Sequence, residues 1–282
     1  MTGTPPLLIV DGHHLLYRAW FGFPARIYNR AKTRDLTGVF GFLALLRKAH
    51  VAHAGDHETV VVFDGENGTA GRTATDAEYK ANRADADHSA VASLGDVKRG
   101  LDTCAVAWLE IDDAEGDDTI ATLTGHATGQ DRAVTVMSGD RDLHQLLDHP
   151  GVRALNTAAP PDRRLVTAAD VTDRYGVYPR QWPDYRALTG DPADNIPGVP
   201  GIGPKTAARL LHGGLTLDDL PASGCLTGAT GTRITLHWDD VRRWRDLIRL
   251  DAKIEIPGDL VTATTTPPLP PAPAVLESLR LW

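Results

Sequence analysis

The sequence predicts an α/β protein with a mostly parallel sheet flanked by helices and a smaller helical unit toward its C-terminal end. Short β-branched runs alternate with longer helical patterns in the first part of the chain, and acidic residues directly follow several of those runs. Beyond Tyr178 the pattern changes to short helices broken by Gly and Pro. With 282 residues the chain exceeds the about 100–200 residues of a typical single domain, so two units are expected.

The predicted strands are short apolar runs separated by helical segments. Alternation of this kind is typical of a parallel sheet covered by helices on its faces. The third and fifth runs are weaker than the others. The runs are Leu7–Val10, Thr59–Phe63, Ala107–Ile111, Ala133–Met137 and Val152–Leu155.

The changes in pattern divide the chain into three parts. Residues 1–177 hold the α/β core, and residues 178–262 form the helical unit. Within the core, residues 65–87 are polar and rich in Gly and Thr, which predicts a mobile loop or a loose helical excursion. Residues 263–282 contain several prolines and are expected to form an extended tail.

Composition indicates a folded, soluble and cytoplasmic protein. Apolar residues make up 42% of the chain and charged residues 23%, close to globular averages. No apolar run approaches the about 20 residues that span a bilayer, and residues 1–6 lack the features of a signal peptide. Cys104 and Cys225 lie far apart, so neither a disulfide framework nor a cysteine zinc site is implied.

The net charge of −8 argues against a polyanionic partner, because nucleic-acid binders usually carry a basic balance. The objection weakens if many of the acids share one site. Two or three divalent cations bound there would cancel about four to six negative charges locally, and the remaining Arg and Lys side chains could still form a positive track.

Acidic residues stand where chemistry is expected in a parallel sheet. Ligands bind beyond the carboxyl ends of the strands, and Asp11 and Asp64 directly follow two of the predicted strands. Asp140 and Asp142 follow a third strand. A fourth group opens the amphipathic helix that runs to about Gly129, and it consists of Glu115, Asp117 and Asp118.

Each of these acids alone has an ordinary structural explanation, as a helix cap or a turn residue. Together, three strand ends and a helix start place carboxylates at the same edge of one sheet. Such a group would repel itself strongly without counter-charges. Bound cations are the natural remedy, and an all-oxygen ligand set favours magnesium or manganese over zinc.

Six motifs, taken with their order and spacing, give the chain a close resemblance to the bacterial and phage 5′ nuclease family. This family includes the N-terminal domain of bacterial DNA polymerase I and the eukaryotic flap endonucleases. The resemblance covers roughly Leu7 to Ile256. The motifs are Asp11–Arg18, Val61–Asp64, Tyr79–Arg83, Glu115–Asp118, Gly139–Leu143 and Tyr185–Asn195.

The resemblance implies a PIN-like nuclease core and a helix-hairpin-helix unit. It also implies hydrolysis of DNA phosphodiesters near free 5′ ends, in replication and repair, by water that two or more Mg²⁺ or Mn²⁺ ions activate. One metal site would use Asp11, Asp64, Glu115 and Asp117, with Asp118 and Asp140 nearby, and a second would use Asp140, Asp142, Asp191 and Asp194.

The polar excursion is, by the same resemblance, a helical gateway over the active site at about residues 65–90. Lys80 and Arg83 lie three apart on a predicted helix and would contact the scissile phosphate, while Tyr79 can stack on a base. A solvated basic face is the alternative. The pair Gly71 and Arg72 stands where the family usually has Phe and Arg, which leaves the order of this gateway open.

A Gly-rich turn at residues 196–203 precedes a predicted helix that continues to about Leu211. It resembles the helix-hairpin-helix element with which the family holds duplex backbone, often around a bound potassium ion. A phosphate-binding P-loop does not fit, because Pro204 separates the last Gly from Lys. A plain turn between helices remains an alternative. The predicted DNA contacts are Gly198, Gly201, Gly203, Lys205 and Thr206.

Other polar residues receive structural interpretations. His13 and His14 have no metal-ligand spacing with another His or Cys, so a supporting role is expected. Residues 242–245 could form a basic and aromatic DNA contact, but an ordinary amphipathic helix is the preferred interpretation.

The sequence therefore predicts a monomeric, stand-alone nuclease acting on 5′ flaps, nicks or 5′-ended duplexes. A non-catalytic module that binds DNA junctions is one alternative, although it would not need the complete acidic set. A PIN-type ribonuclease is another, although it would not need the hairpin after Asp194.

Overall fold

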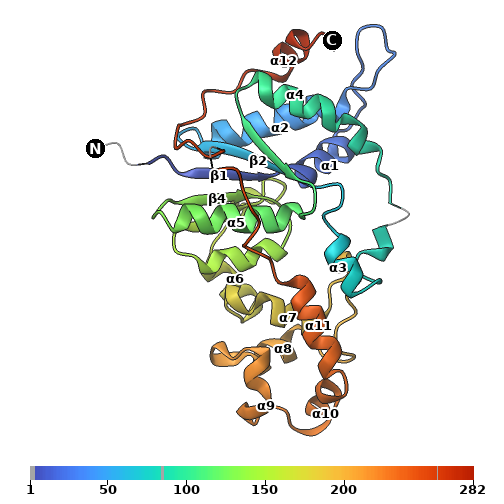
Figure 1. The fold of residues 1–282 in the computed structure, drawn as a ribbon, viewed down its shortest axis with the longest axis vertical. Coiled ribbons are helices and arrows are strands. Elements are labelled where there is room, and N and C mark those ends of the chain that lie inside the picture. Colours follow the sequence, from blue (N-terminus) through green and yellow to red (C-terminus); the bar gives the residue numbers. More distant parts are fainter. Residues whose placement is uncertain (1–3, 84–85, 259) are drawn as a thin grey trace.

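The computed structural model describes residues 4–83, 86–258 and 260–282. A six-stranded sheet with the order β3-β2-β1-β4-β5-β6 lies between layers of helices (Figure 1). Neighbouring strands are parallel except for β5 and β6, so the predicted mostly parallel sheet is confirmed. The strands are β1 (Leu7–Asp11), β2 (Glu58–Asp64), β3 (Ala107–Ile111), β4 (Val134–Met137), β5 (Val152–Leu155) and β6 (Leu165–Val166).

Helices cover both faces of the sheet (Figure 1). α1, α2, α4 and α12 share an apolar cluster with one face, and α5 packs on the other. None of the helices in the described part of the chain is long and apolar enough to cross a bilayer. The α-helices are α1 (Gly12–Gly22), α2 (Thr37–His53), α3 (Ala70–Thr75), α4 (Leu94–Thr103), α5 (Gly116–Thr128), α6 (Ala168–Tyr175), α7 (Trp182–Thr189), α8 (Pro204–Leu210), α9 (Leu220–Ser223), α10 (Gly228–Leu236), α11 (Trp238–Ile248) and α12 (Ala272–Ser278).

The central strands are apolar along their whole length because both of their faces are covered. Leu7 to Val10 in β1 and Val60 to Phe63 in β2 are all buried. β6 is not among the predicted strands; it has only two residues and pairs antiparallel with β5. A strand this short has no periodicity to detect.

The chain order of the strands creates a switch point beside β1. From β1 the chain adds β2 and then β3 on one side, and it then crosses back to place β4 on the other side of β1. Ligands of open α/β sheets bind beyond the carboxyl ends of the strands at such a point. The ends of β1, β2 and β4 therefore mark the candidate site.

The helical unit is packed firmly against the sheet domain. Trp182, Ile234 and Val241 belong to the same apolar cluster as Ile9 and Val60 of the central strands. In Figure 1, α7 to α11 lie at the end of the molecule opposite α12. The predicted change to short helices after Tyr178 is observed, as α7 to α11.

The expectation of an extended tail after residue 262 is wrong over its last part. Residues 272–278 form α12, which packs on α2 and α4. Leu276 is fully buried, and Thr266 Oγ1 accepts a hydrogen bond from Thr59 N at 2.7 Å. The prolines precede the helix or occupy its first turn, where a missing N–H costs nothing, so they do not prevent its formation.

The predicted helix that carries Lys80 and Arg83 is absent from the described residues. α3 ends at Thr75, and a 3₁₀ turn covers only Ala81–Arg83. Lys80 has a φ of 55°, the left-handed region that breaks a helix. Its backbone N donates to Asp194 O at 3.1 Å, so a tertiary contact overrides the helical spacing. Residues 84–85 of the predicted gateway lie outside the described residues.

Candidate functional site

Hydrogen bonds join the ends of three strands at the switch point. Asp11, at the end of β1, accepts from His14 N at 2.9 Å and from Ser138 Oγ at 2.7 Å. Asp64, at the end of β2, accepts from Gly116 N at 2.7 Å. Ser138 follows β4 and Gly116 opens α5. These bonds fix the orientation of both carboxylates at one edge of the sheet.

Asp117 is the centre of the first group of acids. Burial, followed by repulsion from Asp140, Asp11 and Asp64, raises its pKa well above the usual value. Asp11 responds in the same way, because burial is the main cause that raises its pKa to about 7. Four of the predicted metal ligands therefore lie within range of one another's charge.

A second group of acids surrounds Asp142, just after β4. Burial, followed by repulsion from Asp140, Asp191 and Asp194, raises the pKa of Asp142 to about 8. The Asp142 amide donates to Asp140 Oδ1 at 2.8 Å, and Trp182 Nε1 donates to Asp142 Oδ1 at 3.1 Å. Asp140 thus lies within range of the charges of both groups.

Glu115 and Asp118 differ from the other acids because basic side chains already neutralise them. Arg72 contacts both, with 2.7 Å from Nη1 to Glu115 Oε1 and to Asp118 Oδ2, and Lys80 Nζ contacts Glu115 Oε2. Burial opposes ionisation of Glu115, but Lys80 and Arg72 outweigh it, so its pKa is lowered. Asp118 also accepts from Asp251 N at 2.9 Å, so both of its carboxylate oxygens are occupied.

The basic residues of the gateway lie against the acids. Lys80 pairs with Glu115, and Arg83 Nη2 donates to Asp194 Oδ1 at 2.7 Å. The pairing places both side chains at the acidic site without a helix. Tyr79 differs from the expected base-stacking side chain, because it is only 6% exposed and its hydroxyl donates to Glu115 Oε1 at 3.2 Å.

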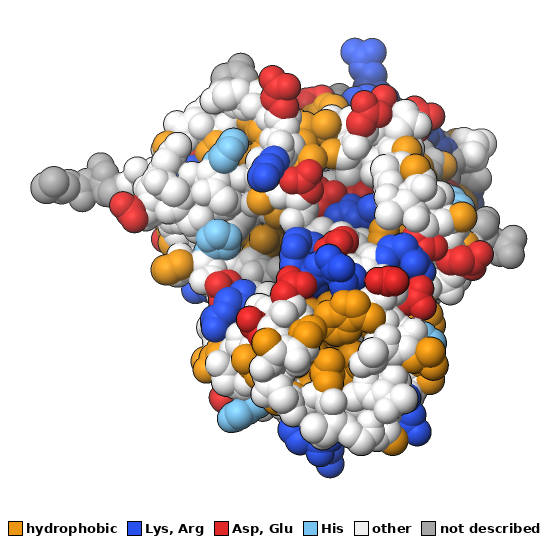
Figure 2. All heavy atoms as spheres, turned by 60° about the horizontal axis from the view of Figure 1, so that its bottom comes forward, with side chains coloured by type: hydrophobic (Ala, Val, Ile, Leu, Met, Phe, Trp, Pro, Cys, Tyr) orange, Lys and Arg blue, Asp and Glu red, His pale blue; other side chains and the backbone are white. Residues whose placement is uncertain are grey.

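A cavity of about 600 Å³ opens over this edge of the sheet. Its walls carry acids from both groups together with the gateway bases. On the face drawn in Figure 2, basic and acidic side chains gather across the middle of the molecule, with hydrophobic side chains below them. The charged residues that line the cavity include Asp11, Asp64, Asp117, Asp140, Asp194, Lys80 and Arg83.

The donor set of this cavity suits a hard divalent cation. As the side chains are placed, no three His, Cys, Asp or Glu residues among those described are arranged to hold a metal ion. Burial, followed by repulsion between neighbouring acids, raises the pKa values of Asp11, Asp117 and Asp142, so these carboxylates lack compensating positive charge. Bound Mg²⁺ or Mn²⁺ would relieve this repulsion, and carboxylate oxygens are the ligands that both ions prefer.

The Gly-rich hairpin between α7 and α8 is held tightly at two glycines. Gly198 and Gly201 have φ values of 69° and 78°. A Cβ on Gly198 would lie 2.3 Å from Gly190 N, whereas a Cβ on Gly203 would meet nothing within 4 Å. Gly198 thus serves the turn itself, and Gly203 leaves open space in front of the first turn of α8.

Several supporting residues were not identified from the sequence. Arg72 holds two of the acids, Ser138 donates to Asp11, and Arg186 Nε donates to Asp191 Oδ2 at 3.1 Å. Arg186 lies inside a recognised motif, which could have identified it. Ser138 had no sequence signal beyond its place after a strand.

The two neighbouring histidines have the supporting contacts that the sequence analysis expected. His13 Nδ1 accepts from Asp64 N at 2.9 Å, and His14 Nε2 accepts from Gly139 N at 3.1 Å. Both side chains therefore fix backbone next to the acids. Residues 242–245 lie on α11, with Trp244 and Arg245 buried, as an amphipathic helix predicts.

Similarity to known proteins agrees with this geometry. Residues 6–176 match the family model for the 5′-3′ exonuclease N-terminal resolvase-like domain, and residues 177–270 match that for the 5′-3′ exonuclease C-terminal SAM fold. The thermostable DNA polymerase I of Thermus thermophilus is 40% identical over 76% of this chain, and that of Thermus filiformis 36% over 98%. The chain spans only 24% and 32% of the length of these two relatives.

The fold also matches a solved flap endonuclease of bacteriophage T5, in a complex with DNA and metal ions. The identity is 20% and the TM-score 0.66, over 96% of this chain and 98% of the T5 protein. At this identity the likeness shows the fold alone. With two family models that together cover most of its length, the chain belongs to the 5′-3′ exonuclease family.

Proposed function

We propose that the protein is a structure-specific 5′-3′ exonuclease and flap endonuclease that hydrolyses DNA phosphodiesters near free 5′ ends. One observation carries the proposal: Asp11, Asp64, Asp117 and Asp140 converge on a single cavity whose wall also carries Lys80. Clustered acids that repel one another destabilise the fold unless cations bind to them. Bound divalent cations would also catalyse hydrolysis at a phosphate, which explains why the acids are clustered.

The acids would hold two or more Mg²⁺ or Mn²⁺ ions. A first site would use Asp11, Asp64, Glu115 and Asp117, with Asp140 and Asp118 nearby, and a second Asp140, Asp142, Asp191 and Asp194. When bound, such ions supply a water nucleophile at neutral pH and stabilise negative charge on the phosphate. The contacts of Asp118 with Arg72 and Asp251 favour a supporting role for this residue over direct ligation.

Lys80 and Arg83 would bind the phosphate that is cleaved. In the protein alone their positive charges rest on Glu115 and Asp194. Cations at the site would compete for these carboxylates and release the basic side chains toward an anionic substrate. Tyr79 would first have to leave its contact with Glu115 before it could stack on a base.

The hairpin would hold duplex DNA through its backbone, without reading sequence. Gly201 and Gly203 amides have no acceptor among the described residues, and Lys205 and Thr206 lie in the first turn of α8. A potassium ion at this turn is part of the proposal. The T5 relative, whose structure contains DNA and metal ions, supports the same class of substrate here. A monomer acting in the cytoplasm completes the proposal.

The proposal is tested by cleavage of a 5′-labelled flap, a nicked duplex and single-stranded RNA side by side. We expect flap and nicked DNA to be cut with magnesium or manganese, leaving 5′-phosphate and 3′-hydroxyl ends. Excess chelator should abolish cleavage. Preferred cleavage of the RNA would favour a PIN-type ribonuclease, and tight flap binding without cleavage in either metal would favour a non-catalytic junction module.

A further inference from the structure

Arg72 makes an unusually complete set of contacts for a side chain outside the predicted site. Its Nε donates to Leu247 O at 2.8 Å, and its Nη1 donates to Glu115 Oε1 and Asp118 Oδ2, each at 2.7 Å. Its Nη2 donates to Asp118 Oδ1 at 2.8 Å and to Arg249 O at 3.1 Å. The side chain is 15% exposed. Every nitrogen of the guanidinium is therefore engaged.

These contacts join three separate parts of the molecule. Arg72 itself lies on α3, in the gateway. Glu115 and Asp118 flank the start of α5, where Asp117 also lies. Leu247 and Arg249 lie at the C-terminal end of α11, in the helical unit, where free carbonyls and the helix dipole attract a cation.

The planar fork of arginine is needed for this arrangement. It presents five donors in fixed directions, so it can bind a carboxylate with two nitrogens while a third donor reaches elsewhere. Burial alone would lower the pKa of Arg72, but its hydrogen bonds to Asp118 and the charge of Glu115 raise it, so the guanidinium is firmly held. Lysine keeps the charge but offers a single nitrogen.

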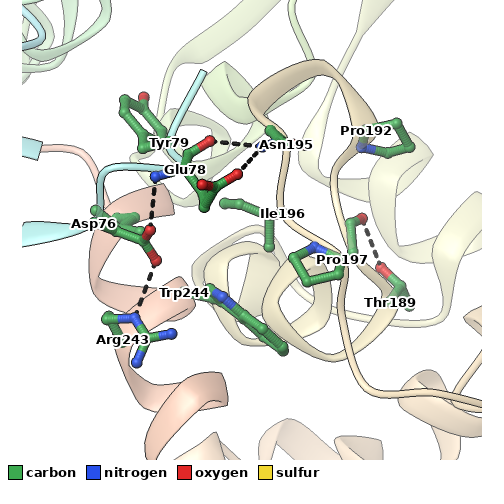
Figure 3. A pocket seen from close by; sticks show the side chains of 12 residues that line it. Asp76, Glu78, Tyr79, Thr189, Pro192, Asn195, Ile196, Pro197, Arg243 and Trp244 are labelled. Atoms are coloured by element: carbon green, nitrogen blue, oxygen red, sulfur yellow. Dashed lines mark hydrogen bonds and ion pairs between the residues drawn. The ribbon is translucent and has the colours of Figure 1, made fainter. Parts of the chain in front are cut away.

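A second ion pair joins the same gateway segment to the same helix without touching the site. Arg243 Nε of α11 donates to Asp76 Oδ2 at 3.0 Å. Figure 3 shows this pair beside a cavity that Trp244 and Ile196 also line. Neither Arg243 nor Asp76 contacts an acid of the site. Loss of this pair would therefore weaken the attachment of the gateway to α11 without changing the contacts of Glu115.

We propose that Arg72 is a positioning residue for the nuclease reaction: it fixes the Glu115 carboxylate at the metal-binding edge and couples that edge to the position of α11 in the helical unit. This inference rests on the proposed function. DNA that engages the helical unit would thereby act on the orientation of a metal ligand. Arg72 itself does not contact the reacting phosphate.

The test uses the full chain with Arg72→Lys, and with Arg243→Gln as the matched control. Manganese binding without DNA is measured by electron paramagnetic resonance, and flap binding is measured in calcium. We expect Arg72→Lys to weaken Mn²⁺ binding by about 10-fold or more, as loss of a residue that orients a metal ligand typically does. Flap binding should stay within about threefold of the parent. Arg243→Gln should leave Mn²⁺ binding within about twofold.

Single-turnover flap cleavage at increasing manganese supplies the second readout. Arg72→Lys should need more manganese to reach half its maximal rate, and Arg243→Gln should not. Unchanged Mn²⁺ binding and manganese dependence in Arg72→Lys would overturn the proposal, and so would equal weakening by Arg243→Gln. If the lysine variant does not fold, Arg72→Gln is measured by the same two readouts and judged by the same outcomes.

These readouts distinguish failure of this inference from failure of the proposed function. A parent protein that binds Mn²⁺ but cuts no DNA would contradict the proposed function, while the binding comparison would still decide the role of Arg72. A parent protein that binds no Mn²⁺ would overturn both.

Discussion

The carboxylate edge of the sheet and the gateway segment meet at one cavity, yet they are specified in different ways. Asp11 and Asp64 hold their positions because each ends a buried parallel strand, and the register of β1 with β2 brings them to the same edge. Lys80 is held at the site by contacts with distant residues, Glu115 and Asp194. Strand order builds the first region, and charge pairing builds the second.

This difference predicts different responses to bound cations. The acids are fixed by the sheet, so metal binding should change their charge more than their position. The gateway is held by the very carboxylates that the cations would bind, so it should loosen or move when they are neutralised.

The largest effect is expected from Asp117→Asn, at the centre of the first acidic group. Asp117 lies within range of the charges of Asp140, Asp11 and Asp64, and Asn removes its own charge from this group. Single-turnover flap cleavage should therefore fall by on the order of 10³-fold or more. Flap binding in calcium should survive. Asp113→Asn is the matched control, because Asp113 is an exposed acid in the turn before α5.

Stability gives this variant a second readout. Because Asp117 is destabilised by its neighbours, Asp117→Asn should melt at a higher temperature than the parent in chelator. A lower melting temperature, or equal loss of binding and rate, would contradict its place at the metal centre.

Lys80→Ala tests the gateway, and a somewhat smaller effect is expected. A Lys ammonium at the scissile phosphate gains most when charge builds in the transition state, so the single-turnover rate should fall by about 10²–10³-fold. Flap binding should change only modestly. Arg83→Ala should be milder, since its side chain is 48% exposed and contacts Asp194 and the Ala193 carbonyl rather than Glu115. A rate within about twofold of the parent would instead favour a solvated basic face.

Two glycines of the hairpin differ in whether the fold has room for a side chain at their position. Gly203→Ala adds a methyl group into open space, so the fold should be unaffected. If the Gly203 amide lies against DNA phosphate, the Michaelis constant on duplex substrates should rise by a few fold, with little change on short single strands. Gly198→Ala is the contrast, because its positive φ and backbone contacts predict a loss of stability of roughly 1–3 kcal/mol.

Equal effects of Gly203→Ala on duplex and single-stranded substrates would remove the hairpin from the duplex interface. A plain turn between helices would then be the better interpretation. Urea denaturation of both variants supplies the stability comparison.

Sequence reasoning located the acids because their positions follow from local pattern. A buried run such as that ending at Asp64 predicts a parallel strand, and the residue after it must lie at the ligand-binding edge. The predicted helix at Lys80 was wrong because spacing of three residues is compatible with a helix but does not require one. The conformation there depends on Asp194, more than a hundred residues away in sequence, and no local signal encodes that contact.

Arg72 shows the same limit from the other side. Its sequence neighbour Gly71 departs from the family pattern, which left the order of the gateway open. In the structure the order comes from Arg72 itself, through partners on α5 and α11 that only the tertiary fold brings together.

The last prediction concerns how the melting temperature depends on pH in chelator, where no divalent cation is bound to the acids of the sheet edge. The pKa of Asp11 is raised from 3.8 to about 7 and that of Asp142 from 3.8 to about 8. A raised pKa in the folded state means that stability is greatest at low pH and is lost as pH rises through the folded value. Buried His144 acts in the opposite direction, since its pKa is lowered from 6.5 to about 4, but it acts mainly between these two pH values.

Of Asp11, Asp142 and His144, only the two acids should therefore lower stability as the pH rises from 6.5 to 8. At about 1.4 kcal/mol per pKa unit, the expected loss is about 2 kcal/mol, or roughly 4–8 °C in melting temperature. Asp142→Asn should flatten most of this slope, because Asn has no proton to lose. Saturating magnesium or manganese in the parent should also flatten it, because bound cations stabilise the ionised acids. Differential scanning calorimetry across this pH range is the measurement. A melting temperature that rises with pH in chelator would show that ionisation of these acids does not destabilise the folded protein. It would contradict the idea that uncompensated carboxylates at this edge of the sheet favour cation binding.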